Sequence, residues 1–307
     1  MVPDQFTLKE TVLPVGDSHQ LYVQLWGNNR AKNTILYLHG GPGSGCSDSA
    51  KKLFDPKSQK VIFFDQRGCG RSLPYGSLQN NTINNLVADI NKILNAFGLK
   101  KVIICGGSWG SCLALVYAIR NSDKVKAMVL RGIFTARKIE VDFVDNGGLK
   151  FTYPDAWARY VLGVLKKDRE SPTDYHVAQI LMGDRAGVKK SAYAYSQLEA
   201  AIGSLEGPAP VESFKDFDST RMIIHMHYLA NDCFLPEGYI LRNAGRLKVP
   251  VALVQGRYDM ICPPFTAFEL SQKLPNCKLI WTIAGHSAQD SANLQAVRSA
   301  LSEQIGS

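Results

Sequence analysis

One short segment constrains the fold of this chain more than any other. Residues 101–105 form an apolar, β-branched run suited to a buried strand, and residues 111–119 form an apolar stretch suited to a helix. Between them, residues 106–110 read GGSWG, a G-x-S-x-G pattern. A strand that turns this sharply into a helix strains the backbone of its central residue, and neighbouring glycines avoid the resulting clashes. We therefore predict a turn that exposes the Ser108 hydroxyl at a helix N-terminus, as a candidate nucleophile.

Other apolar runs alternate with helical patterns along the chain. A helix is expected over residues 82–97, with Thr82 as its N-cap and Gly98 as its stop, and a last helix over residues 287–304. Continuous apolar strands that alternate with helices are typical of a mostly parallel sheet covered on both faces. The sequence therefore predicts an α/β fold. The strand candidates are residues 21–26, 34–38, 61–64, 102–105, 127–131, 251–255 and 279–283.

The alternation fails between about residues 135 and 246. This stretch has few strand-like runs, and helical patterns cover 155–165, 184–202 and 217–229. Because it is inserted between two sheet strands, it is expected to form a helical cap over the carboxyl ends of the strands, where such sheets bind ligands. The predicted division is a first core part at 1–134, a cap at 135–246 and a second core part at 247–307.

A serine nucleophile needs a base and an acid that orients the base. In folds with this serine turn, the acid and then the histidine follow the serine, on loops after late strands. Asp259 and His286 follow the last two strand candidates in that order. Asp290 competes for the role of the acid, but it lies after the histidine and within the final helical pattern. We predict a triad of Ser108, Asp259 and His286.

An oxyanion formed at the serine needs two hydrogen-bond donors. The N–H of Trp109, directly after the serine, is the first candidate. The second is expected from the glycine-rich loop at residues 39–43, which reads HGGPG after an early strand. We assign it to the N–H of Gly41, since Pro42 has no N–H to donate.

Charge and cysteine content narrow the expected partners. The formal net charge is +8, but the basic residues are scattered and the longest cluster, at 166–169, is interrupted by an acid, so no nucleic-acid partner is expected. No apolar run is long enough to span a membrane, and the first residues lack the layout of a signal peptide. The seven cysteines are odd in number and lack metal-type spacing. Reduced thiols and a cytoplasmic location are expected.

Four motifs together resemble the proline iminopeptidase (prolyl aminopeptidase) family. They are HGGPG at 39–43, DQRGCGRS at 65–72, GGSWGS at 106–111 and GRYDMICPP at 256–264, and the likeness extends through nearly the whole chain. Members of this family are serine peptidases with the α/β-hydrolase fold that release an N-terminal proline. The resemblance implies the same fold here, and the same triad as the residues themselves predict.

The resemblance also implies how the substrate's ammonium group is bound. In the family, two glutamates of the cap hold it. Glu199 corresponds to the first, within a segment similar to the family's motif. At the second position this chain has His225 in place of glutamate. The prediction for the ammonium site is therefore Glu199 with His225.

The remaining substrate-binding residues follow from the same resemblance. Phe134 matches one wall of the family's aromatic proline pocket, while the position near Val144 is aliphatic here. Tyr228 and Leu229 follow the His225 motif, and Leu229 replaces a phenylalanine. The hydrolytic machinery thus matches the family more closely than the specificity residues do.

We predict a serine hydrolase that releases an N-terminal residue, proline favoured, from small peptides or amides through an acyl-enzyme. No metal or organic cofactor is implied, and the oligomeric state is left open. The alternatives are an amidase or esterase acting on an uncharged acyl group, and a non-catalytic ligand-binding protein on the same scaffold.

Overall fold

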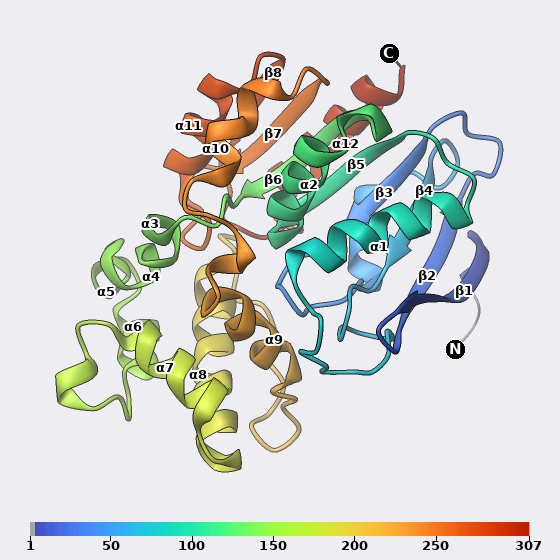
Figure 1. The fold of residues 1–307 in the computed structure, drawn as a ribbon. Helices are drawn as coiled ribbons and strands as arrows, with labels where there is room; N and C mark the ends of the chain where they lie inside the picture. Colours follow the sequence, from blue (N-terminus) through green and yellow to red (C-terminus); the bar gives the residue numbers. More distant parts are fainter. Residues whose placement is uncertain (1–3, 307) are drawn as a thin grey trace.

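The centre of the molecule is one eight-stranded sheet with the order β1-β2-β4-β3-β5-β6-β7-β8 (Figure 1). The computed structural model describes residues 4–306, with side chains for residues 4–304. The first two strands pair antiparallel to each other, β2 pairs antiparallel to β4, and all other pairs are parallel. The prediction of a mostly parallel sheet is confirmed. The strands are β1 (Thr7–Gly16), β2 (His19–Gly27), β3 (Thr34–Leu38), β4 (Lys60–Phe64), β5 (Val102–Ser108), β6 (Val125–Ile133), β7 (Val251–Gly256) and β8 (Cys277–Thr282).

Most strand bounds differ from the sequence prediction by one or two residues, and two differences are larger or of another kind. The edge strand β1 was not predicted, because most of its side chains are exposed or half-buried and it carries no continuous apolar run. Strand β5 continues to Ser108 rather than ending at residue 105, since Gly106 and Gly107 still pair with β6. The serine therefore stands directly at the carboxyl end of a central strand.

Helices cover both faces of the sheet. The apolar side chains of α1, α2, α10 and α11 pack in one buried cluster with one face, and those of α12 and η1 pack with the other. Burial of these faces is the main stabilising contribution to the core. The elements are α1 (Ile83–Ala96), α2 (Trp109–Arg120), α10 (Tyr239–Asn243), α11 (Pro264–Lys273), α12 (Ser291–Gly306), η1 (Asp48–Leu53), η2 (Ser122–Lys124) and η5 (Ala244–Arg246).

The ends of two helices show how local sequence sets their bounds. The Thr82 hydroxyl accepts a hydrogen bond from the N–H of Asn85 and caps α1, and Gly98 beyond its end has φ of +63°. Helix α12 begins at Ser291, four residues later than predicted, because residues 287–290 form a loop. In that loop Asp290 accepts the backbone hydrogen bond from Leu294.

The chain between β6 and α10 consists of helices that gather beside the end of the sheet where β5 and β6 stop (Figure 1). They share an apolar cluster of their own, which includes Tyr160, Tyr195 and Met226. Helix α6 ends earlier than predicted, before Gly163 with φ of +93°, and α7, with proline at its first position, was not predicted. The elements are α3 (Lys138–Val141), α4 (Phe143–Asn146), α5 (Leu149–Thr152), α6 (Pro154–Tyr160), η3 (Lys166–Asp168), α7 (Pro172–Met182), α8 (Arg185–Ile202), α9 (Thr220–Leu229) and η4 (Asp232–Phe234).

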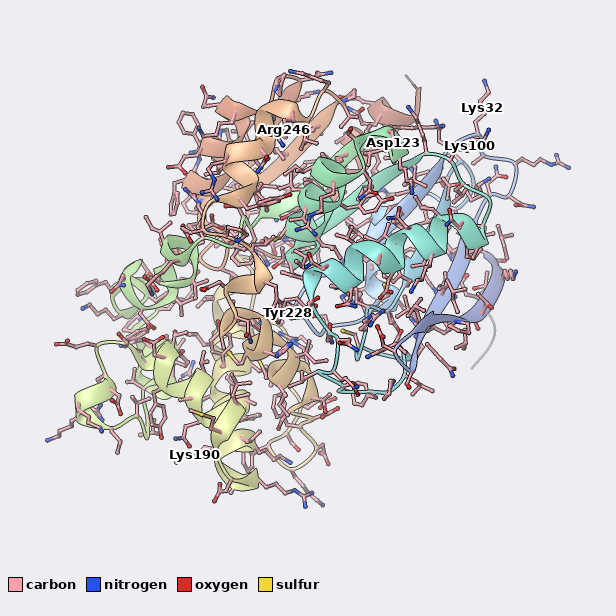
Figure 2. The ribbon with its side chains drawn as sticks, viewed as in Figure 1. Lys32, Lys100, Asp123, Lys190, Tyr228 and Arg246 are labelled. Carbon is pink, nitrogen blue, oxygen red and sulfur yellow. The ribbon has the colours of Figure 1, made fainter. Side chains whose placement is uncertain are left out.

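Four of the basic residues are labelled in Figure 2. Lys190 and Arg246 lie at opposite ends of the molecule, and Lys32 and Lys100 lie together at a third place. Within residues 4–306, none of the helices combines the length and the apolar character needed to cross a bilayer.

Candidate active site

Ser108 occupies a strained turn between β5 and α2. Its φ of 57° and ψ of −128° lie in a region that residues other than glycine seldom adopt. Close packing explains the flanking glycines: a Cβ on Gly110 would lie 2.1 Å from the carbonyl oxygen of Leu38, and one on Gly106 would lie 2.5 Å from that of Gly110. The Ser111 hydroxyl donates a hydrogen bond of 2.7 Å to the Ser108 carbonyl and supports the turn.

Asp259 and His286 meet at the same edge of the sheet. The Nδ1 of His286 donates to Oδ2 of Asp259 over 2.8 Å, since an ionised carboxylate can only accept. The other oxygen of Asp259 accepts from the backbone N–H groups of Ile261 and Cys262, at 3.0 and 2.8 Å. With Nδ1 bound in this way, Nε2 of His286 is the nitrogen left to exchange a proton with a reacting group.

Gln255 is a site residue that the sequence analysis did not identify. Its amide nitrogen donates to Oδ2 of Asp259 at 3.2 Å and to the carbonyl of Cys262 at 3.0 Å, and its amide oxygen accepts from the N–H of Ile133. The side chain is fully buried. The available signal was a single polar residue within the otherwise apolar strand β7. Gln255 thus links two strands to the Asp259 carboxylate.

Asp290, the competing acid, makes contacts of a different kind. Its carboxylate accepts hydrogen bonds from the Ser204 hydroxyl, from the N–H of Leu205 at 3.2 Å and from the N–H of Gly285 at 2.8 Å. These contacts tie the loop that carries His286 to the loop that follows α8. Asp290 is therefore placed to support the loop, while Asp259 binds the imidazole.

The glycine-rich loop at 39–43 runs directly past the serine turn. A Cβ on Gly40 would lie 3.4 Å from the Cβ of Ser108. Gly41 has φ of +112°, and a Cβ there would lie 2.6 Å from the backbone nitrogen of Gly43, so this position requires glycine. The predicted oxyanion donors, the N–H groups of Gly41 and Trp109, belong to these two adjoining segments.

Gln66 connects the same two segments. Its backbone N–H donates to Nε2 of His39 and its amide nitrogen donates to the His39 carbonyl, both at 3.0 Å. Its amide oxygen accepts from the indole N–H of Trp109 at 2.9 Å. Burial lowers the pKa of His39, so its ring is neutral and Nε2 can accept. This residue of the DQRGCGRS motif holds the glycine-rich loop against the turn that carries Ser108.

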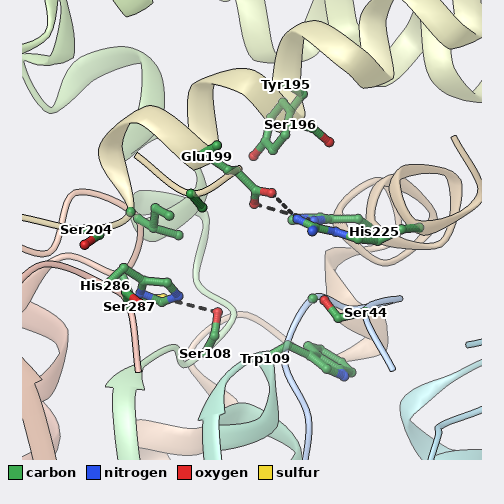
Figure 3. Close-up of a pocket in the computed structure, with 18 of the residues that line it drawn as sticks. Ser44, Ser108, Trp109, Tyr195, Ser196, Glu199, Ser204, His225, His286 and Ser287 are labelled. Atoms are coloured by element: carbon green, nitrogen blue, oxygen red, sulfur yellow. Dashed lines mark hydrogen bonds and ion pairs between the residues drawn. The ribbon is translucent and has the colours of Figure 1, made fainter. Parts of the chain in front are cut away.

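A cavity of about 890 Å³ opens above Ser108. Figure 3 shows the Ser108 hydroxyl and the His286 ring facing it from the side of the sheet, with Glu199 and His225 facing it from the helices opposite. Gly41, Trp109, Phe134, Val144 and Leu229 also line it. All the predicted site residues except Asp259 and Tyr228 therefore border one cavity, and Asp259 is buried beside the His286 ring that it binds.

The structure places Tyr228 outside this cavity, contrary to the prediction. Its hydroxyl donates to the Asn81 side chain at 2.8 Å, and its ring packs 4.6 Å from that of Trp109. Figure 2 shows Tyr228 where α9 meets the core. On a helix, residues four apart share a face, so Arg221, His225 and Leu229 line the cavity while Tyr228 points away.

The predicted ammonium site contains an ion pair that the sequence did not reveal. Nη2 of Arg221 lies 2.5 Å from Oε2 of Glu199. Nδ1 of His225 lies 3.9 Å from the other oxygen of Glu199, beyond hydrogen-bonding distance. Burial, the largest cause, lowers the pKa of His225; Glu199 opposes this shift and Arg221 adds to it.

One thiol lies beside Ser108. The Sγ of Cys262 is 3.9 Å from the Oγ of Ser108. Burial raises the pKa of Cys262 well above its ordinary value, so the group stays a neutral thiol at neutral pH. It therefore adds no charge beside the serine.

The sheet order and the position of its serine turn define the class of protein. A family model described as "alpha/beta hydrolase fold" matches residues 33–292, and the chain is an α/β-hydrolase. Within this class, relatives named "Proline iminopeptidase" match it over nearly their full length. The relative from Xylella fastidiosa is 36% identical, and the match covers 97% of this chain and 96% of the relative. The relative from Neisseria gonorrhoeae is 35% identical, and the match covers 94% of this chain and 95% of the relative. The chain belongs to the proline iminopeptidase family.

Solved structures agree on the fold. The proline iminopeptidase of Mycobacterium smegmatis superposes with a TM-score of 0.64 at 17% identity, over 97% of this chain and 99% of that one. An epoxide hydrolase mutant of Vigna radiata gives a TM-score of 0.67 at 14% identity, over 97% of this chain and 98% of that one. At these identities the likeness shows the fold alone. The full-length relatives confirm the predicted family and the predicted class of enzyme, a serine aminopeptidase.

Proposed function

We propose that this enzyme cleaves the amide bond after the N-terminal residue of small peptides or amides, with proline favoured at that position. One observation carries the proposal. Ser108 stands on a strained turn facing the same cavity as His286, whose other nitrogen is bound to Asp259 at 2.8 Å. This arrangement provides a nucleophile, a base and an orienting acid in one place.

The proposed reaction has two halves. Ser108 Oγ attacks the carbonyl carbon while Nε2 of His286 takes its proton, and the N–H groups of Gly41 and Trp109 stabilise the oxyanion. The C–N bond then breaks, and His286 returns the proton to the leaving amine. Water hydrolyses the resulting acyl-enzyme with His286 again acting as base. Asp259 holds the imidazole in the required tautomer throughout.

The walls of the cavity support a small apolar acyl group. Phe134, Val144 and Leu229 provide apolar surface, and Glu199 provides a carboxylate for the amino end of the substrate. The relatives named proline iminopeptidase support proline as the favoured residue. We infer a peptide or amide substrate whose first residue fills this space.

We also propose that residues 135–246 act as a cap on a core formed by 1–134 and 247–307. Helices α8 and α9 contribute Glu199 and His225 to the cavity that Ser108 faces. In this role the cap carries the substrate-binding groups, and the sheet carries the reacting ones.

A cytoplasmic location is proposed from the thiols. All seven cysteines are free, and five of them are buried. Unpaired cysteines are usual in a reducing compartment.

Labelling of the nucleophile tests the reaction. A fluorophosphonate should label the wild type and Ser271→Ala, a control at a half-buried serine of α11 outside the cavity, but not Ser108→Ala. Ser108→Ala should lose prolyl arylamide hydrolysis by a factor on the order of 10⁴ to 10⁶ while remaining folded. A folded Ser108→Ala variant that keeps more than about a tenth of the turnover contradicts the proposal.

A second candidate function is hydrolysis of amides or esters with an uncharged acyl group. The observation that favours it is the ion pair between Glu199 and Arg221, which occupies the carboxylate expected to bind an ammonium. Comparing a prolyl arylamide with its N-acetyl derivative separates the two functions, because an aminopeptidase cleaves the free substrate faster and a hydrolase of uncharged acyl groups cleaves the blocked one faster.

A further inference from the structure

The acidic side chains around the cavity are largely engaged with other groups of the protein. Apart from the exposed Glu212, each carboxylate that lines the cavity has a partner within the part of the chain that the structure describes. An incoming cation therefore meets few carboxylates that lack a partner. The partners are Thr135 and Arg137 for Glu140, Arg221 for Glu199, Ser291 for Glu206, Tyr75 for Asp218, and Ser204 and Gly285 for Asp290.

Glu199 is the carboxylate expected to receive a substrate ammonium, and a guanidinium already binds it. The Arg221 contact of 2.5 Å joins α9 to α8. Charge repulsion from Arg221 opposes a second cation at the same carboxylate. Since 45% of the Arg221 side chain is exposed, water screens part of this repulsion.

His225 adds an independent observation. Its ring lines the cavity, the residue is 93% buried, and its Nδ1 has no hydrogen-bond partner within the described chain. A buried polar atom without a partner is costly, so a ligand that supplies one is favoured. A neutral imidazole nitrogen can donate or accept, depending on its tautomer, which suits an uncharged amide group.

We infer that Arg221 is a specificity-determining residue: by holding the Glu199 carboxylate, it makes this end of the cavity accept an uncharged amide at the amino end of the substrate as well as a free ammonium. The substrate class thus includes peptides or amides whose N-terminus is acylated. This inference rests on the proposed function, because it assumes that Ser108 cleaves the bond that follows the acyl group placed here.

The test measures kcat/KM for a prolyl arylamide and its N-acetyl derivative. The wild type is expected to hydrolyse both. Arg221→Gln should raise the ratio of free to blocked substrate by about tenfold or more, chiefly by improving the free one, because the removed guanidinium no longer competes for Glu199. The matched control is Arg159→Gln, which removes another exposed arginine–carboxylate pair, with Asp155, that does not line the cavity. It should leave the ratio unchanged.

Two further variants keep the inference open to refutation if Arg221→Gln folds poorly. Arg221→Lys retains the positive charge and should keep the wild-type ratio to within about threefold. Glu199→Gln should lower the ratio, because it removes the carboxylate that an ammonium needs. The inference is overturned if the wild type rejects the N-acetyl substrate. It is also overturned if the ratio measured for Arg221→Gln stays within about threefold of the wild-type ratio.

Different results would contradict the proposed function and the role of Arg221. If the proposed function is wrong, arylamide hydrolysis is absent or survives Ser108→Ala. If only the inference about Arg221 is wrong, hydrolysis of the prolyl arylamide depends on Ser108, but the ratio does not depend on residue 221.

Discussion

The carboxylate of Asp290 accepts a hydrogen bond of 2.8 Å from the N–H of Gly285, the residue directly before His286. The same carboxylate binds Ser204 and Leu205, at the end of the helix that carries Glu199. One buried side chain therefore joins the loop that carries His286 to the end of α8. In contrast, Asp259 contacts the imidazole itself.

The two carboxylates should respond differently to the same substitution. Asp259→Asn favours the wrong tautomer of His286 and should lower kcat by about 10⁴-fold. Asp290→Asn should instead lower the free energy of unfolding by about 1–3 kcal/mol, since an amide nitrogen would face a backbone donor, with a loss of kcat below about tenfold. Urea unfolding and steady-state kinetics measure both effects. If the losses of kcat were reversed, Asp290 would be the catalytic acid.

Gln255 should be required for the orientation of Asp259. Gln255→Met removes the hydrogen bond to the carboxylate while roughly keeping the volume, and a hydrogen bond to a charged group contributes about 1.5–3 kcal/mol. We expect kcat to fall by about tenfold or more with KM little changed. Gln272→Met, at an exposed position of α11, is the control. Equal kinetics for Gln255→Met and the wild type would show that Asp259 is positioned without Gln255.

Gly110 should not tolerate any side chain. A Cβ at this position would lie 2.1 Å from the Leu38 carbonyl, so Gly110→Ala must displace either β3 or the start of α2. We expect a loss of more than about 2 kcal/mol in the free energy of unfolding, or failure to fold. Gly245→Ala, where the nearest atom lies 3.9 Å away, should unfold like the wild type. Similar stabilities for the two variants would contradict the close packing of this turn.

A carboxylate at position 225 should strengthen binding of a free N-terminus. His225→Glu places a second carboxylate near Arg221, so one of the two can bind a substrate ammonium while the other keeps the guanidinium. We expect kcat/KM for a prolyl arylamide at neutral pH to rise about tenfold or more, and the N-acetyl derivative to show no gain. An equal response of both substrates would place His225 away from the amino end of the substrate.

His176 should make stability depend on pH. Burial lowers its pKa from the ordinary value of 6.5, so the folded protein holds it neutral while the unfolded chain protonates near 6.5. The neutral His176 therefore contributes fully to the free energy of unfolding above pH 6.5. This contribution is lost as the pH falls from about 6.5 toward the lower pKa of the folded state. The wild type should therefore lose more stability than His176→Phe between pH 7.5 and 5.5, as measured by urea unfolding. If the difference in free energy of unfolding between the wild type and His176→Phe did not change with pH, this prediction would be refuted.

Local sequence determined much of the core. Apolar runs identified seven of the eight strands. In the inner strands, burial on both faces leaves a pattern that needs no knowledge of neighbours, and the half-buried edge strand β8 still carries a short apolar run at 279–281. The turn at Ser108 was likewise readable, since the backbone there demands glycines at nearby positions. Strand β1 escaped prediction because an exposed edge places little demand on its side chains.

The tertiary structure decided which side chains share the cavity. Glu199 and Arg221 lie on different helices, and neither the pairing nor its effect on the ammonium site follows from spacing along the chain. Tyr228 was assigned to the substrate, yet the rotation of α9 turns it toward Trp109 and turns Arg221 and His225 inward. Helix rotation and strand contacts, such as that of Gln255 with Asp259, depend on how distant segments pack. A single sequence carries no direct record of that packing.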